Sequence, residues 1–244
     1  MVDPDRDATL ALATLRACRL FGGMDEASLE LVGDALRPRH FRRGETLFHV
    51  GDPGDALFIV ASGSVKITLP PDDGSEPAIL TTIGPGGFFG ELALLDGGRR
   101  SATAVALDAV TTLILRRDAL DHLVDDQPAL RRALLVALAA EIRRLTAQVQ
   151  DLHFLDLPGR LAQHLLRSLP HEPGASDDPE AALPDGEVRL SWPYTQAELA
   201  GMIGGSRQSV NRLLSEYVAA GLVRFEVDEL VIPDAHRLAA AIRR

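Results

Sequence analysis

Short apolar runs separated by turn residues fill the first half of the chain. They recur at spacings of roughly ten residues between Leu20 and Leu115, which predicts an antiparallel β-sandwich or barrel. Glycine, proline and aspartate lie between the runs, where glycine permits a positive φ and proline fixes a turn. The predicted elements are a short helix, Asp25–Leu36, and the strands Thr46–Val50, Ala56–Ala61, Val65–Leu69, Ile79–Ile83 and Thr111–Leu115.

The pattern changes to a helical period after Pro128. Apolar residues then alternate at spacings of three and four, as the a and d positions of heptads do. Such a narrow apolar stripe packs either on the chain's own β-domain or on the same helix of a second copy. We expect the second arrangement, a parallel two-helix seam in a homodimer with two-fold symmetry. The seam residues are Leu135, Leu138, Ile142, Leu145, Val149 and Leu152.

A second unit is predicted after this helix. The segment Leu152–Pro158 is interpreted as a hinge, in which Asp156 caps a helix that runs from Gly159 to Leu169. The stretch from His171 to Gly186 is rich in proline, glycine and acidic residues, which predicts a surface loop. A short strand, Glu187–Ser191, follows the loop.

A helix, a glycine turn and a second helix follow the strand. Thr195 and Glu198 match a capping box at the start of the first helix, and Gly204 ends it. Ser206 caps the second helix, Arg207–Ala219, and this order is typical of a helix-turn-helix. A predicted hairpin wing, Leu222–Phe225 with Leu230–Ile232, and a last helix, Ala235–Arg243, complete the chain.

Composition limits the class of protein. Of the 244 residues, 46% are hydrophobic and 25% are charged, which is typical of a soluble globular chain, and the length predicts one large domain or two modest ones. No apolar run approaches the roughly 20 residues that cross a bilayer, and the acidic N-terminus is unlike a signal peptide, so we expect a cytoplasmic protein without a membrane partner. One cysteine, Cys18, permits no internal disulfide. We expect domains at 1–126, 127–153 and 154–244.

The segment around Gly90 carries candidate chemistry. A short helix that follows a glycine presents free backbone amides, which suit an anion. Arg100 and Ser101, about ten residues later, can return to the same place and add donors that match phosphate oxygens. The Glu91 carboxylate opposes an anion unless it faces a neutral donor, such as a ribose hydroxyl. A phosphate fused to a ribose would satisfy all of these groups.

This segment resembles a known domain. Residues Phe89–Leu95 with Arg100–Ala102, and Gly51–Val60 with Gly63–Lys66, are similar to the cyclic-nucleotide-binding domain. CRP/FNR-type transcription regulators of bacteria and the regulatory subunits of cyclic-nucleotide-dependent kinases share that domain. The resemblance extends through the hinge, Leu152–Ala162, to the C-terminal unit. It implies an α+β chain with an N-terminal jelly-roll (β-roll) domain, a long dimerisation helix and a C-terminal winged helix-turn-helix.

The resemblance also implies ligand contacts. Glu91 would hold the ribose 2′-hydroxyl, Arg100 and Ser101 would hold the cyclic phosphate, and the backbone from Gly90 to Leu92 would assist. In the family a pair of polar residues on the long helix contacts adenine, and here Leu145 and Thr146 stand at those positions, so only Thr146 keeps a polar group. We expect cAMP as the effector. Cyclic GMP, cyclic di-GMP and a pocket without a nucleotide remain alternatives.

The second helix of the helix-turn-helix carries the candidate DNA contacts. Arginine pairs with guanine and glutamine with adenine, and hydroxyl groups suit phosphates. Where the family has glutamate, this chain has Gln208, which leaves the preferred base open. The net charge of −10 argues against indiscriminate binding of nucleic acid but not against a local basic surface. The candidates are Gln196, Ser206, Arg207, Gln208, Ser209, Asn211 and Arg212.

We weighed other classes of function against this prediction. The chain lacks the common hydrolase, P-loop and zinc-protease motifs, and its seven histidines show no metal-ligand spacing. We therefore expect no catalytic residue, no metal and no cofactor beyond an effector nucleotide. The expected partners are double-stranded DNA with a pseudo-palindromic site, a second copy of the chain and RNA polymerase. The rivals are a nucleotide-binding module of a partner enzyme and a DNA-binding regulator with an unused pocket.

Overall fold

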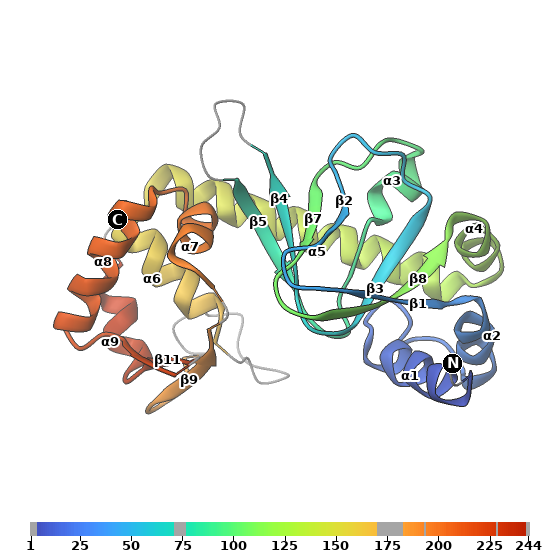
Figure 1. The fold of residues 1–244 in the computed structure, drawn as a ribbon, viewed down its shortest axis with the longest axis horizontal. Coiled ribbons are helices and arrows are strands. Elements are labelled where there is room, and N and C mark those ends of the chain that lie inside the picture. The colour runs from blue at the N-terminus through green and yellow to red at the C-terminus, as the bar shows by residue number, and fades with distance from the viewer. Residues whose placement is uncertain (1–3, 71–76, 170–182, 193, 228, 243–244) are drawn as a thin grey trace. The chain divides into compact units, whose positions relative to one another are not determined.

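The computed structural model describes residues 4–70, 77–169, 183–192, 194–227 and 229–242 (Figure 1). The chain forms two compact units. The N-terminal unit comprises Met1–Pro70 and Ile79–Arg143, and the C-terminal unit comprises Pro71–Ala78 and Arg144–Arg244. The predicted loop His171–Gly186 lies largely outside the described residues.

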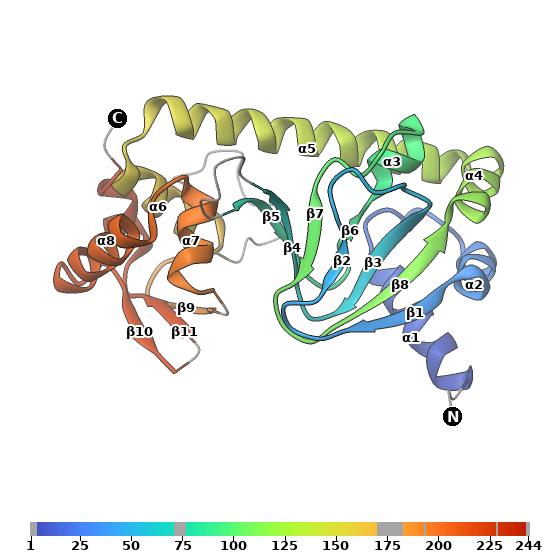
Figure 2. The same ribbon diagram turned by 45° about the horizontal axis from the view of Figure 1, so that its top comes forward.

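Two four-stranded antiparallel sheets form the roll of the N-terminal unit (Figures 1 and 2). Their strand orders are β1-β8-β3-β6 and β2-β7-β4-β5. The five predicted strands are present, and β1, β6 and β7 are additional. The bounds are β1 (Arg37–Phe41), β2 (Thr46–Phe48), β3 (Ala56–Ser62), β4 (Val65–Leu69), β5 (Ala78–Ile83), β6 (Phe88–Phe89), β7 (Thr103–Ala106) and β8 (Val110–Arg116).

Strand β3 is buried on both faces. Phe58 and Val60 face the interior of the roll, where they pack with residues of the opposite sheet such as Val65. Leu57 and Ile59 belong to a second core, beneath the helices. A strand covered on both faces shows a continuous apolar run instead of alternation, which explains the sequence of β3.

Helices cover this second face of the roll. They include α1 (Pro4–Ala17), α2 (Glu26–Ala35) and α4 (Arg117–Asp126), with the start of α5 (Pro128–Phe154). The prediction of α2 was right, and Asp25 caps it through the backbone amide of Ser28. Sequence reasoning missed α1 and α4. The short helix α3 (Glu91–Asp96) lies against β3.

The C-terminal unit contains four helices after α5, within the described residues. They are α6 (Leu157–Arg167), α7 (Gln196–Ile203), α8 (Arg207–Ala219) and α9 (Ala235–Ala240). The predicted caps at Asp156, Thr195 and Ser206 are all present. Three helix boundaries were wrong by two or three residues: α6 runs from Leu157 to Arg167, and α9 ends at Ala240.

The wing is a three-stranded sheet and not an isolated hairpin. Strand β11 (Glu229–Ile232) pairs with β10 (Arg224–Glu226) and also with β9 (Val188–Ser191). The predicted strand before the helix-turn-helix is therefore part of the wing. Among the described residues, no helix is long and apolar enough to cross a membrane.

A buried hydrogen bond joins α8 to the start of α6. The Tyr217 hydroxyl donates to the Pro158 carbonyl oxygen at 2.7 Å, and burial raises the pKa of Tyr217 to about 12. Close packing at Gly205 accompanies this bond, because a Cβ there would lie 2.9 Å from Leu157 Cδ1. Helices α6, α7 and α8 therefore share one core.

Two glycines in turns of the roll allow the cost of a positive φ to be distinguished from the cost of a close contact. Gly44 and Gly63 both have φ near +80°, at 79° and 76°. A Cβ at Gly63 would lie 2.3 Å from the Ala109 carbonyl oxygen, whereas a Cβ at Gly44 has no neighbour within 4 Å. Only Gly63 is therefore held by a close contact as well as by its φ.

We expect Gly44→Ala to lower the free energy of unfolding by about 1 kcal/mol, the cost of a left-handed alanine, and Gly63→Ala to lower it further. Urea unfolding of both variants measures the difference. Equal losses in the two variants would contradict the argument from crowding.

Candidate functional site

The segments predicted to bind an anion meet at one end of the roll. Gly90 has φ 85° and begins α3. The loop before β7 returns to the loop after β2, because the Gly51 amide donates to the Arg100 carbonyl and the Arg100 amide donates to the Asp52 carbonyl. The Arg100 side chain then reaches Gly90, with Nη1 donating to its carbonyl oxygen at 2.8 Å. The fold thus brings Gly90 and Arg100 together.

Arg100 is buried, with a relative exposure of 4%. Its Nη2 donates to the Ala56 carbonyl oxygen at 2.8 Å, and its Cζ lies 4.3 Å from the centre of the Phe48 ring. Its Nε is buried without a hydrogen-bond partner, and no carboxylate in the described residues forms an ion pair with it. Burial lowers the pKa of this guanidinium, while Asp55 and Glu91 at longer range favour its charge. A buried cation of this kind favours an anion.

Glu91 is the half-buried carboxyl group of the same site. Desolvation raises its pKa and the charge of Glu141 on α5 adds to this, whereas a hydrogen bond from its own backbone amide and the charge of Arg100 act in the opposite direction. A desolvated carboxylate gains from a hydrogen-bond donor, so a ligand hydroxyl is a suitable partner. The sequence analysis did not include Glu141, because an acidic residue on an amphipathic helix gives no local signal.

The remaining predicted ligand residues are exposed. Leu92 lies on α3 with an exposure of 42%, and Ser101 follows Arg100 on the surface. Thr146 lies on α5 in the C-terminal unit, also with an exposed side chain. The structure therefore brings together Gly90, Glu91 and Arg100, with Leu92 and Ser101 as their chain neighbours.

The candidate DNA contacts form an exposed surface at the start of α8. Arg207, Gln208 and Asn211 are exposed, and Gln196 at the start of α7 joins them because its Nε2 donates to Asn211 Oδ1 at 3.3 Å. Arg207 forms no ion pair within the described residues. Arg212 lies 3.6 Å from Glu216 one turn later, so its charge is partly compensated.

Two serines of this surface serve the helix itself. Ser206 Oγ accepts a hydrogen bond from the Ser209 amide at 3.1 Å, and the two hydroxyl groups lie 2.9 Å apart. Ser206 is therefore the N-cap of α8. One hydroxyl hydrogen of the pair remains free to donate to a phosphate, which is fewer contacts than the sequence suggested.

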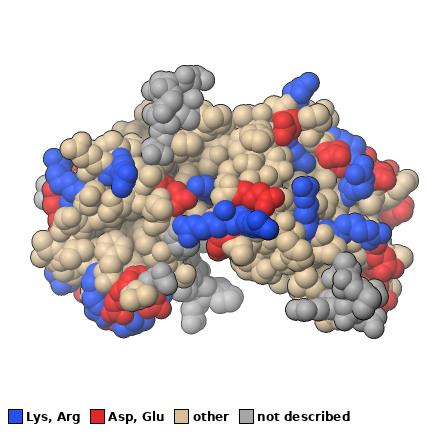
Figure 3. All heavy atoms as spheres, viewed as in Figure 1, with Lys and Arg blue, Asp and Glu red and all other residues tan. Residues whose placement is uncertain are grey.

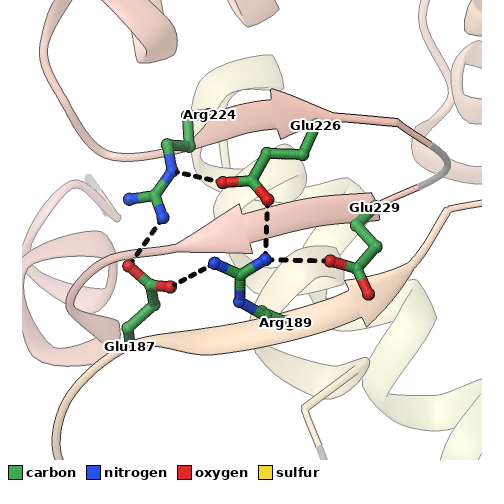
Figure 4. A network of polar contacts seen from close by, with 5 residues as sticks. All are labelled: Glu187, Arg189, Arg224, Glu226 and Glu229. Atoms are coloured by element: carbon green, nitrogen blue, oxygen red, sulfur yellow. Dashed lines mark hydrogen bonds and ion pairs between the residues drawn. The ribbon is translucent and has the colours of Figure 1, made fainter.

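The wing presents no uncompensated cation in its described part (Figure 4). Arg189 donates to Glu226 at 2.6 Å and to Glu229 and Glu187 at 3.1 Å. Arg224 contacts Glu187 at 2.8 Å and Glu226 at 3.0 Å. Three carboxylates thus surround two guanidinium groups, and these contacts lower the pKa of Glu226. On the face drawn in Figure 3, Lys and Arg side chains are likewise interspersed with Asp and Glu.

The apolar stripe of α5 is largely exposed in the single chain. Its members Leu135, Ile142, Leu145, Val149 and Leu152 have exposures of 39% to 68%. Leu138 differs, because it is half-buried. An exposed row of large apolar side chains at heptad spacing is typical of a helix that has a partner.

Two family models match the chain. A cyclic nucleotide-binding domain matches residues 38–127, and a Crp-like helix-turn-helix domain matches residues 159–241. The first match contains the residues around Gly90 and Arg100, and the second contains α7, α8 and the wing. Helix α5 lies between the two matched segments.

Similar proteins match over most of their length. The CRP-like cAMP-activated global transcriptional regulator of Mycobacterium tuberculosis is 36% identical over 92% of this chain and 96% of its own. The cyclic AMP receptor protein of Thermus thermophilus is 32% identical over 86% of this chain and 90% of its own. The solved structure of the c-di-GMP responsive global regulator CLP of Xanthomonas campestris has 26% identity and a TM-score of 0.69, and the similarity covers 86% of this chain and 99% of that one.

Proposed function

The chain belongs to the CRP/FNR family of transcription regulators, and we propose that it is a homodimer whose binding to DNA is controlled by a cyclic nucleotide in the β-roll. The observation that carries this proposal is Arg100, buried and without an ion pair among the described residues, beside the desolvated Glu91. A cyclic phosphate would supply the anion that Arg100 lacks. The ribose of the same ligand would supply a hydroxyl donor for Glu91.

We propose cAMP as the effector. Two relatives that match most of the chain are named for cAMP, and the pocket has the two groups that a ribose and a cyclic phosphate require. Cyclic di-GMP is the second candidate, because Xanthomonas CLP is named for it and because Leu145 offers no hydrogen bond to a base. A contact between Thr146 and the base of the nucleotide is likewise proposed.

The exposed stripe of α5 supports a dimer. A second copy of the helix would bury the apolar side chains from Leu135 to Leu152 against their own equivalents. The ligand would then favour one arrangement of the pair over another, and it must bind that arrangement more tightly to have any effect. The two copies of α8 would be related by the same two-fold axis.

The start of α8 supports specific recognition of DNA. Arg207 and Gln208 would contact base edges in the major groove, and Gln196, Ser206, Ser209, Asn211 and Arg212 would contact bases or phosphates beside them. A two-fold dimer would read a pseudo-palindromic site whose half-sites lie about one helical turn apart. Such a regulator acts on DNA in the bacterial cytoplasm, with RNA polymerase as a candidate partner.

We expect Arg100→Ala to weaken the binding of cAMP by about 10- to 150-fold, since a hydrogen bond to a charged group contributes about 1.5–3 kcal/mol. Arg99→Ala is the matched control, because Arg99 is exposed and donates to the Gly51 carbonyl. Titration calorimetry of both variants with cAMP, cGMP and cyclic di-GMP measures the effect. Arg100→Lys retains a charge and tests the site if the alanine variant does not fold.

A wild-type protein that binds none of the three nucleotides would refute control by a cyclic nucleotide. Wild-type affinity in Arg100→Ala would refute the role of Arg100.

We expect Leu135→Asp to make the protein monomeric, because a carboxylate in an apolar seam faces its own copy. Val136→Asp should leave the dimer intact, although Val136 is almost as exposed, at 57% against 68% for Leu135. Analytical ultracentrifugation of both variants separates the seam from general surface effects. Dimers in both variants, or a monomeric wild-type protein, would rule out this seam.

We expect Arg207→Ala to lose about 1–3 kcal/mol of discrimination between a selected operator and random DNA. Arg224→Ala should change little, because Glu187 and Glu226 already compensate that guanidinium. Fluorescence anisotropy with both DNAs over a range of salt gives the discrimination and the number of phosphate contacts. An unchanged ratio of the two affinities in Arg207→Ala would exclude base recognition by this residue.

A further inference from the structure

Arg117 makes three side-chain hydrogen bonds next to the site around Gly90 and Arg100, and no local sequence pattern marks it. It is the first residue of α4, and its backbone amide donates to the Asp55 carbonyl at 2.9 Å. Its Nη1 donates to the Leu94 carbonyl oxygen at 2.8 Å. Its Nη2 donates to the carbonyl oxygens of Gly54 and Ala93, each at 2.8 Å. Three segments of the chain therefore meet on one guanidinium.

These contacts satisfy the end of α3. The last four carbonyl groups of a helix have no partner inside it, and Ala93 and Leu94 are two of these four in α3. A cation at this end also interacts favourably with the negative pole of the helix dipole. A helix as short as α3 is unstable alone, so it depends on contacts of this kind.

Gly54 shows how closely α3 is held. A Cβ at this position would lie 2.2 Å from Ala93 Cβ and 3.5 Å from Arg100 Cζ. The Arg117 Nη2 group bonds to both backbones that meet there, at Gly54 and Ala93. The guanidinium thus fixes the distance between α3 and the loop before β3.

The two arginines hold α3 at opposite ends. Arg100 ties Gly90, just before α3, to Ala56 at the start of β3. Arg117 ties the end of α3 to Gly54, two residues before Ala56. An anion at this site would bind N–H groups of Arg100 that no carbonyl accepts, that of Nε among them, whereas three of the four terminal N–H groups of Arg117 already donate to carbonyls.

We infer that Arg117 is a positioning residue that keeps α3, and with it Gly90 and Glu91, in place for the binding of the ligand phosphate by Arg100. The inference rests on the proposed function for its ligand, but the anchoring of α3 does not need a ligand. Arg117 is also the first residue of α4, and α5 follows α4 in the chain. The same contacts therefore connect α3 and Gly54 to the helix that leads into α5.

Hydrogen exchange without nucleotide tests the anchor. We expect the backbone amides of residues 91–97 to exchange faster in Arg117→Ala than in the wild-type protein, with both measured on the whole 244-residue chain. Arg116→Ala is the matched control, since Arg116 is exposed and only approaches Asp55 at 3.8 Å and Asp118 at 4.0 Å. Exchange at residues 91–97 that is unchanged in Arg117→Ala would overturn the inference.

Titration with cAMP tests the effect on the pocket. We expect Arg117→Ala to bind cAMP roughly 10- to 100-fold more weakly, by analogy with the loss on mutation of residues that orient the ligands of a metal site. Arg116→Ala should bind as the wild-type protein does. Low-millimolar methylguanidinium should restore part of the affinity in Arg117→Ala and leave the affinity of Arg116→Ala unchanged, a response that a general loss of stability would not give.

Arg117→Lys covers the case in which the alanine variant does not fold. One ammonium nitrogen can replace one guanidinium nitrogen but cannot reach all three carbonyls, so we expect faster exchange in α3 and weaker binding of cAMP. Wild-type behaviour of Arg117→Lys in both measurements would overturn the inference. Faster exchange in the variants, combined with a wild-type protein that binds no cyclic nucleotide, would retain the anchor and refute the proposed function.

Discussion

A guanidinium buried without a carboxylate is the constraint around which the N-terminal unit is organised. Removing a charge from water costs several kcal/mol, and this cost is offset only if its hydrogen bonds and electrostatic contacts are good. Arg100 donates hydrogen bonds to two backbone carbonyls and lies over the ring of Phe48, which provides a cation–π contact. Its Nε has no hydrogen-bond partner in the described residues. The site is thus stable enough to form and still incomplete.

Glycine makes this arrangement possible. A Cβ at Gly90 would lie 2.5 Å from Arg100 Nη1, and φ is 85° there, so a side chain would be excluded by both contact and conformation. Gly54 permits the same close approach on the other side of α3. The glycines in this motif therefore make room for the Arg100 side chain as well as forming the turn. This is a physical reason for the residues that resemble the family's motif.

Local signals predicted most of the elements, and tertiary contacts account for most of the misses. The caps at Asp156, Thr195 and Ser206 could be predicted because each acts within four residues of the chain. The pairing of β9 with β11 could not, because it joins segments about 40 residues apart and only the wing hairpin has a local turn. Arg117 left no pattern, since its partners are backbone carbonyls that any sequence provides.

The hydrogen bond between Tyr217 and Pro158 links the orientation of α8, the proposed DNA-reading helix, to the predicted hinge before α6. Helices α6, α7 and α8 share one core, and this bond fixes α8 to the first turn of α6. A change of backbone angles at residues 154–156 would therefore turn all three helices as one rigid body. In a two-fold pair, the distance between the two copies of α8 would then depend on the backbone angles of those few residues.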